Sequence, residues 1–199
     1  MRGFSARKKR GDVGMCKKIR EVNSLTPEIV LQKFWDQKIP VDIKHILEKI
    51  GILYRENDFS KLESALRIEK DDAILGLALS HEDDLGILYS SRMDRDSTNY
   101  VLAHEFAHCV LHLEPSEKYH VELKMSKDLF SANRRKSLIS RYLNSHKELQ
   151  ADRFAADLLI PTEALLQFIE DVQNIDMAGI AKHFQVPKEI VRLKIMNLR

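Results

Sequence analysis

The sequence of 199 residues is poor in cysteine, glycine and proline, and it has no long apolar run. Its two cysteines, Cys16 and Cys109, exclude a disulfide framework and a cysteine metal cluster, and the cytoplasm is the compartment they favour. The longest apolar run, Ala73 to Leu79, has seven residues, whereas a helix that crosses a bilayer needs about 18. With 44% hydrophobic and 31% charged residues, the composition indicates a globular chain that is long enough to bury a core.

Charge is distributed unevenly along the chain. Residues 1–20 carry eight Lys or Arg and one Asp, which leaves 24 basic and 29 acidic residues in the remainder. We therefore interpret residues 1–22 as a basic, disordered leader and residues 23–199 as the folded domain. No apolar stretch follows the basic residues, which argues against a secretory signal. Contact of the leader with nucleic acid is the alternative, although the leader has no base-reading motif.

The hydrophobic spacing predicts an α+β fold, in which helices flank a small, antiparallel sheet. Strands are expected at residues 52–54, 73–80 and 85–90. Helices are expected from Pro27 and over residues 41–50, 99–113, 146–160, 162–171, 177–184 and 188–198. Between residues 115 and 146 the pattern predicts only a short strand near 119–124 and a basic helix near 129–143.

The helix expected at residues 99–113 contains the pattern H-E-x-x-H, with His104 and His108 at its ends and Glu105 after the first histidine. Histidines four residues apart share one helix face, so their imidazoles can converge on a single metal ion. Glu105 is offset by one residue and can act as a general base toward water without being a ligand. Zinc suits this donor set. The alternative is a helix with two exposed or packed histidines, because short motifs also occur by chance.

A catalytic zinc ion needs a third protein ligand. His112 lies about 12 Å along the helix axis from His104, so we expect it to support a ligand or to pack rather than to share the ion. Glu148 and Asp152 lie on one face of the next long helix, whose alanines permit close approach to a partner. We expect Glu148 to bind the metal and Asp152 to accept a hydrogen bond from a ligand histidine, fixing its tautomer. A solvated acidic face is the alternative.

Both motifs resemble those of a known family. Residues 101–112 (VLAHEFAHCVLH) resemble the active-site helix of the ImmA/IrrE-family metallopeptidases, and residues 148–161 are similar to their second motif, E-x-x-A-[ND]-x-F-A-x-x-L-L-x-P. The resemblance extends from about residue 25 to the C-terminus. It implies a gluzincin-type site in which Glu148 is the third ligand of one zinc ion. The stretch of residues 113–147 looks long for the family and contains the basic segment Arg134-Arg135-Lys136.

The resemblance also implies a substrate class, because similar proteins act in the cytoplasm on protein targets, often helix-turn-helix repressors of transcription. We therefore expect a zinc-dependent endopeptidase that cleaves a cytoplasmic regulatory protein and contacts neither a membrane nor, directly, nucleic acid. An additional donor is needed for the oxyanion of the reaction, and the sequence leaves four candidates open, namely Tyr119, His120, Tyr142 and His146.

Residues 172–199 have the spacing of a helix-turn-helix, although Gln185 replaces the usual glycine of the turn. We interpret this segment as a helical cap on the domain, since the chain outside the leader is acidic and DNA-reading helices need a basic footprint. The alternative function is a DNA-binding or partner-binding regulator with a degenerate metal site.

Overall fold

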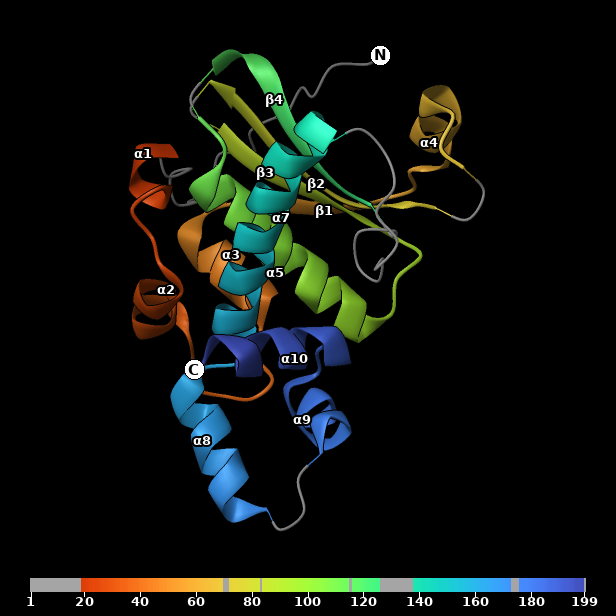
Figure 1. The fold of residues 1–199 in the computed structure, drawn as a ribbon. Coiled ribbons are helices and arrows are strands. Elements are labelled where there is room, and N and C mark those ends of the chain that lie inside the picture. Colours follow the sequence, from red (N-terminus) through yellow and green to blue (C-terminus); the bar gives the residue numbers. More distant parts are fainter. Residues whose placement is uncertain are drawn as a thin grey trace.

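The computed structural model describes residues 19–69, 72–82, 84–114, 116–125, 138–172 and 176–198, and these form a four-stranded sheet covered by helices (Figure 1). The strands, in the spatial order β1-β3-β2-β4, are β1 (Leu53–Asn57), β3 (Asp84–Ser90), β2 (Ile74–Glu82) and β4 (Ser116–Met125). The α+β class is confirmed. Two strand pairs are antiparallel as expected, but β1 pairs with β3 in parallel, because helix α4 (Ser60–Leu66) separates β1 from the β2–β3 hairpin.

The remaining helices of the described residues lie mainly below the sheet in Figure 1. They are α1 (Ile19–Val22), α2 (Pro27–Phe34), α3 (Ile43–Ile50), α5 (Arg95–Leu111), α7 (Leu138–Leu159), α8 (Thr162–Asp171), α9 (Met177–Phe184) and α10 (Lys188–Asn197). None of the helices in these ranges has the length and apolar character that a membrane span requires.

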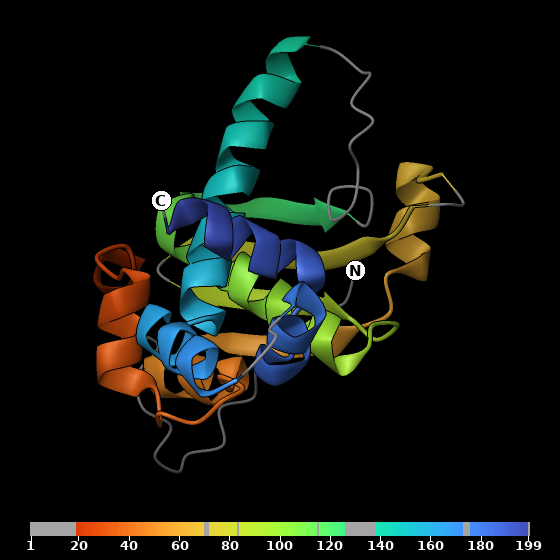
Figure 2. The same cartoon turned by 60° about the horizontal axis from the view of Figure 1, so that its bottom comes forward.

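Helix α5 is the centre of the core. All of its residues from 100 to 110 are buried, and it packs against β2 and β3 on one side and against α7 on the other. Helix α7 packs against α5, and its alanines at positions 151, 155 and 156 are fully buried. Residues without a long side chain let a helix approach its neighbours closely. The two crossing helices are visible together in Figures 1 and 2.

Helix ends follow the expected capping chemistry. Asp42 accepts a hydrogen bond from the amide of His45 at the start of α3, and Gly51 ends this helix with a φ of 86°, a conformation that favours glycine. The side chain of Asp94 caps α5 by accepting from the amide of Ser97 at 2.8 Å. Helix α5 therefore begins at Arg95, before residue 99, where the sequence pattern predicted its start.

Several boundaries expected from the sequence are wrong. Residues 19–22 were expected to belong to the disordered leader, but they form α1, and Val22 is fully buried in the core. Helix α7 begins at Leu138 rather than at 146, and α4 has no counterpart among the expected elements. Residues 1–18 of the leader and residues 126–137, which include most of the predicted basic helix, lie outside the described residues.

Helices α9 and α10 form a cap that is tied to α7. Ile190 and Val191 of α10 are buried, and α10 contacts α7 and α9. Lys194 is also buried, and its Nζ donates to Asp157 Oδ1 at 2.7 Å and to Thr162 Oγ1 at 2.9 Å. These contacts use the inner face of α10 for packing. The interpretation of residues 172–199 as a helical cap stays a prediction.

We expect the substitution Lys194→Met to lower the free energy of unfolding by about 1–3 kcal/mol, because it removes two hydrogen bonds made by a charged donor. Denaturant titration followed by circular dichroism measures this change. Lys188→Met is the matched control, since Lys188 is an exposed lysine of the same helix, and it should alter stability by less than about 0.5 kcal/mol. Equal stability of the two variants would contradict a role for Lys194 in anchoring the cap.

Candidate metal centre

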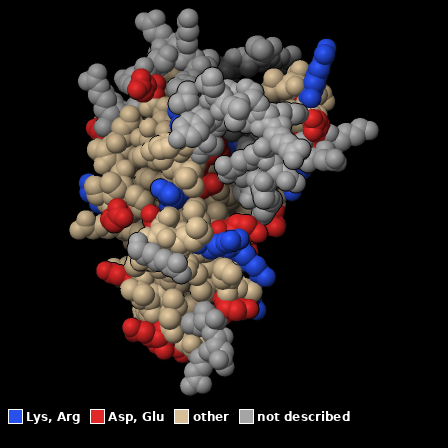
Figure 3. All heavy atoms as spheres, in the orientation of Figure 1, with Lys and Arg blue, Asp and Glu red and all other residues tan. Residues whose placement is uncertain are grey.

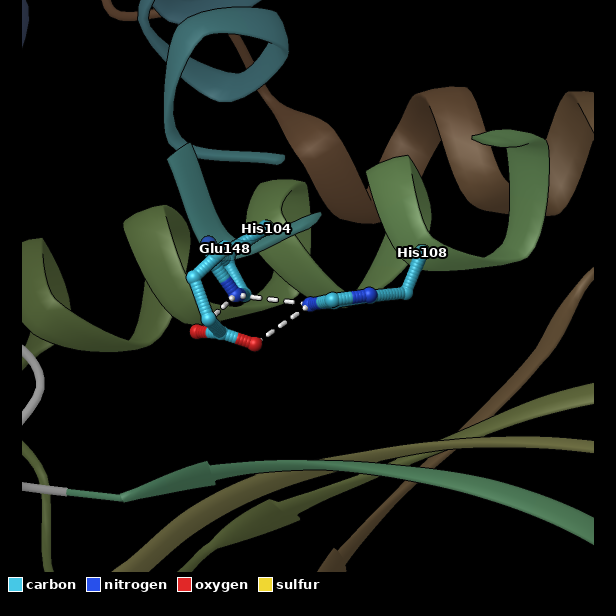
Figure 4. A group of neighbouring side chains, drawn as sticks. All are labelled: His104, His108 and Glu148. Carbon is cyan, nitrogen blue, oxygen red and sulfur yellow. Dashed lines mark hydrogen bonds and ion pairs between the residues drawn. The ribbon is translucent and has the colours of Figure 1, made fainter. Parts of the chain in front are cut away.

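Two histidines of α5 and one glutamate of α7 converge on one point (Figure 4). Nε2 of His104 and Nε2 of His108 are 3.0 Å apart. Glu148 Oε2 lies 3.3 Å from Nε2 of His104, and Glu148 Oε1 lies 3.2 Å from Nε2 of His108. All three donor atoms fall within 4.8 Å of one another. The structure thus brings together the three residues expected to be metal ligands.

His104 is oriented by a carboxylate behind it. Its Nδ1 lies 2.7 Å from Oδ1 of Asp152, which also accepts a hydrogen bond from the hydroxyl of the buried Tyr100. A proton on Nδ1 that is donated to Asp152 leaves the lone pair of Nε2 for a metal ion. Asp152 thus contacts His104, one of the three converging residues, and its role behind a metal ligand stays a prediction.

His108 is oriented by the uncharged side chains of His112 and Gln150. Its Nδ1 lies 2.9 Å from Nδ1 of His112, and Nε2 of His112 lies 3.2 Å from Oε1 of Gln150. One proton arrangement satisfies both contacts: His112 donates through Nε2 to Gln150 and accepts through Nδ1 from His108. Nε2 of His108 is then free of a proton, as a metal ligand must be. His112 accordingly contacts His108 and lies apart from the three converging donors.

Glu105 lies on the face of α5 that meets the sheet, and its side chain is fully buried. A Cβ atom placed on Gly76 of β2 would lie 2.5 Å from Oε1 of Glu105 and 2.7 Å from its Cγ. The Glu105 side chain therefore occupies the space that any other residue at position 76 would fill. Gly76 is opposite Lys124 of β4 in the strand register, so both residues belong to the same face of the sheet.

Lys124 brings a positive charge into the centre. It is buried, and its Nζ donates to Glu148 Oε2 at 3.1 Å and to Asp152 Oδ1 at 3.2 Å. Burial alone would lower the pKa of this amine, but the charges of Asp152 and Glu148 outweigh burial and raise the pKa above its ordinary value. Lys124 is thus a buried ammonium ion held by two carboxylates.

The carboxylates are held in their charged form. Burial would raise the pKa of Glu148, but as long as protons on Nε2 of His104 and His108 take the place of a metal ion, their hydrogen bonds to the carboxylate, together with the charge of Lys124, hold that pKa well below its usual range. Burial would also raise the pKa of Asp152, but the hydrogen bond from His104 and the charge of Lys124 lower it to about 2. The negative charge that a metal cation requires is therefore present at neutral pH.

Three residues of the centre were missed by sequence reasoning. Tyr100 carries a signal, because it lies four residues before His104 and thus on the same helix face. Gln150 follows Glu148 by two residues and has no motif of its own, and Lys124 depends on the strand register. Of the four candidate oxyanion donors, His146 is exposed on α7, and the side chains of the other three lie outside the described part of the chain.

Two histidines and a glutamate from crossing helices, with a second glutamate inside H-E-x-x-H, form a site of the metallopeptidase type. Residues 47–196 match the peptidase family described as the IrrE N-terminal-like domain. The chain therefore belongs to this family, which confirms the resemblance found in the sequence and supports a metallopeptidase-type function. No curated protein and no solved structure matched the chain.

Proposed function

We propose that this chain is a zinc-dependent endopeptidase that cleaves a cytoplasmic regulatory protein at a specific site. The observation that carries the proposal is the convergence of His104, His108 and Glu148 within 4.8 Å, next to a buried glutamate in H-E-x-x-H. The support for peptide hydrolysis is membership of a peptidase family.

The donor set fits zinc. Two imidazole nitrogens and one carboxylate oxygen match the three-ligand sets of catalytic zinc sites, which leave a fourth position for water or substrate. His104 and His108 each have a partner on Nδ1, which directs the lone pair of Nε2 toward the shared point. Divalent calcium or magnesium would instead favour an all-oxygen site. When bound, a zinc ion supplies Lewis acidity toward a carbonyl group and toward water.

Glu105 is the group that we assign to proton transfer. In this role, its carboxylate takes a proton from the attacking water and returns it to the amine nitrogen of the departing peptide fragment. The side chain is fully buried between α5 and β2, so its position is set by packing rather than by solvent. Asp152 and His112 act behind the ligands, where they hold the imidazole rings in one tautomer.

The substrate and the compartment follow the resemblance to the ImmA/IrrE family. A helix-turn-helix repressor of transcription in the cytoplasm is the target class that we propose, with one zinc ion per chain and no direct contact with nucleic acid. On the face shown in Figure 3, the Lys and Arg of the described residues are interspersed with Asp and Glu rather than gathered in one patch. A DNA-reading surface would need a clear basic footprint.

Metal analysis of the purified full chain tests the proposal. We expect about one zinc ion per chain in the wild type, and loss of that zinc on dialysis in both His104→Ala and Glu148→Ala. Glu163→Ala is the control, because Glu163 is an exposed acid on α8, and it should keep the metal. Full zinc affinity in Glu148→Ala would remove Glu148 from the ligand set, and a wild type that binds no zinc under any loading condition would overturn the enzyme proposal.

A further inference from the structure

A buried lysine inside a cluster of carboxylates is the least expected feature of the centre. Lys124 comes from β4, whereas the three converging donors come from α5 and α7. Its side chain is 1% exposed. Within the described part of the chain, its hydrogen bonds go to two acidic residues of α7, Glu148 at 3.1 Å and Asp152 at 3.2 Å. The sheet therefore contacts, through Lys124, the helix that carries Glu148.

This position argues against contact between Lys124 and a substrate. A group that binds substrate needs an open side, and Lys124 has almost no exposed surface. Its ammonium is instead committed to the oxygens of Glu148 and Asp152, which are themselves 21% and 24% exposed. Lys124 therefore acts through the carboxylates and is a candidate positioning residue.

Glu148 has two oxygens, and Lys124 contacts only one of them. Oε2 lies 3.1 Å from the ammonium, while Oε1 lies 3.2 Å from Nε2 of His108. A charge-assisted hydrogen bond withdraws donor strength from the oxygen that accepts it. Lys124 thus leaves Oε1 as the stronger donor of Glu148.

The same ammonium opposes a second cation at this place. Like charges a few ångströms apart repel strongly in a partly buried site, where the effective dielectric constant is far below that of water. Glu148 and Asp152 keep other partners when Lys124 is lost, because Glu148 also contacts His104 and His108, and Asp152 also contacts His104 and Tyr100. Loss of Lys124 should therefore loosen the two carboxylates in the metal-free protein without releasing them from the centre. The charge of Lys124 should therefore matter more for metal affinity than its hydrogen bonds.

From this geometry we infer that Lys124 is a positioning residue with two effects: it holds the Glu148 and Asp152 carboxylates together in the metal-free protein, and its charge weakens the binding of a divalent cation. The inference rests on the proposed metal-dependent function. It predicts that the centre, as built, binds zinc less tightly than its donor set alone would allow.

The test is the zinc dissociation constant of the full chain, measured by competition with a chromophoric chelator at one pH, together with the melting temperature of the metal-free protein. We expect Lys124→Met to bind zinc at least tenfold more tightly than the wild type, a difference of about 1.4 kcal/mol, and to melt at a lower temperature without metal. Lys124→Gln should change both quantities in the same direction, and it provides a second neutral variant if Lys124→Met does not fold. Lys124→Arg keeps the charge and should restore an affinity within about threefold of the wild type.

Lys194→Met is the matched control, because Lys194 is also buried and paired with a carboxylate but belongs to the cap. It should lower the melting temperature without changing zinc affinity. The comparison distinguishes the effect of losing any buried lysine from the effect of removing a positive charge at the metal centre. Unchanged or weaker zinc binding in the neutral Lys124 variants, beside a wild type that binds zinc, would overturn this inference alone. A wild type that binds no zinc would overturn the proposed function and this inference with it.

Discussion

Replacing Glu105 by glutamine should abolish peptide hydrolysis while leaving the metal bound. Glutamine has nearly the same shape as glutamate, so it can occupy the space above Gly76, but it cannot accept a proton from water. Loss of a positioned general base typically lowers the rate by a factor of about 10² to 10⁴. Because Glu105 is not among the three converging donors, the zinc content should equal that of the wild type.

The experiment must find the substrate as well as measure its cleavage. We expect new protein N-termini, quantified by terminal labelling and mass spectrometry, in cells that produce the wild-type chain and not in cells that produce Glu105→Gln. A peptide that spans such a site then gives kcat/KM for both proteins. Glu114→Gln, which alters an exposed glutamate just beyond α5, should behave like the wild type. Equal cleavage by the wild type and by Glu105→Gln would remove Glu105 from the reaction.

A single methyl group at position 76 should damage both stability and catalysis. The Cβ of Gly76→Ala would lie 2.5 Å from Oε1 of Glu105 and 2.8 Å from Cγ1 of Val101, and both of these residues are buried on α5. Overpacking of this kind costs about 1–3 kcal/mol in the free energy of unfolding. Because displacement of a reacting group by about 1 Å can cost a factor of 10² in rate, we also expect activity to fall by tenfold or more.

Gly86→Ala is the control for this prediction, since it adds the same methyl group to the neighbouring strand β3. There the new Cβ would meet only Leu53 O, at 3.7 Å, which is an ordinary contact distance. Denaturant titration and kcat/KM measured on the cleaved peptide compare the two variants. If Gly76→Ala were as stable and as active as Gly86→Ala, the close approach of Glu105 to β2 would not be needed for stability or for activity.

The helices near the centre could be predicted because their signals are local. Thr26 followed by Pro27, and Gly51 after an apolar stripe, are capping patterns that depend on neighbouring residues only. The parallel pairing of β1 with β3 could not be predicted in this way. It arises because β1 pairs with the second strand of the β2–β3 hairpin rather than with the first, and no local residue pattern specifies that partner. Helix α4 was missed because it is short and its apolar residues, Leu62, Ala65 and Leu66, span only one turn; none of them is buried.

The residues of the candidate site show the same difference between local and long-range signals. His104 and His108 were found because four residues bring them to one face of one helix, and Glu148 and Asp152 were found because they share a face of another. Lys124 was not, because its approach to Glu148 depends on the pairing of β4 with β2, opposite Gly76. A strand register that links residues 76 and 124 leaves no periodic signal in the sequence.

Because the three donors are divided between α5 and α7, a bound metal ion would connect these two helices. An ion held by His108 and Glu148 would act as a removable cross-link, closing a loop of the 39 residues between them. A permanent covalent link around a loop of this size is worth about 4 kcal/mol in chain entropy. Because loop-closure entropy grows only logarithmically, doubling the connection would cost about 0.6 kcal/mol more. The long connection between the two motifs is therefore compatible with an unchanged set of ligands.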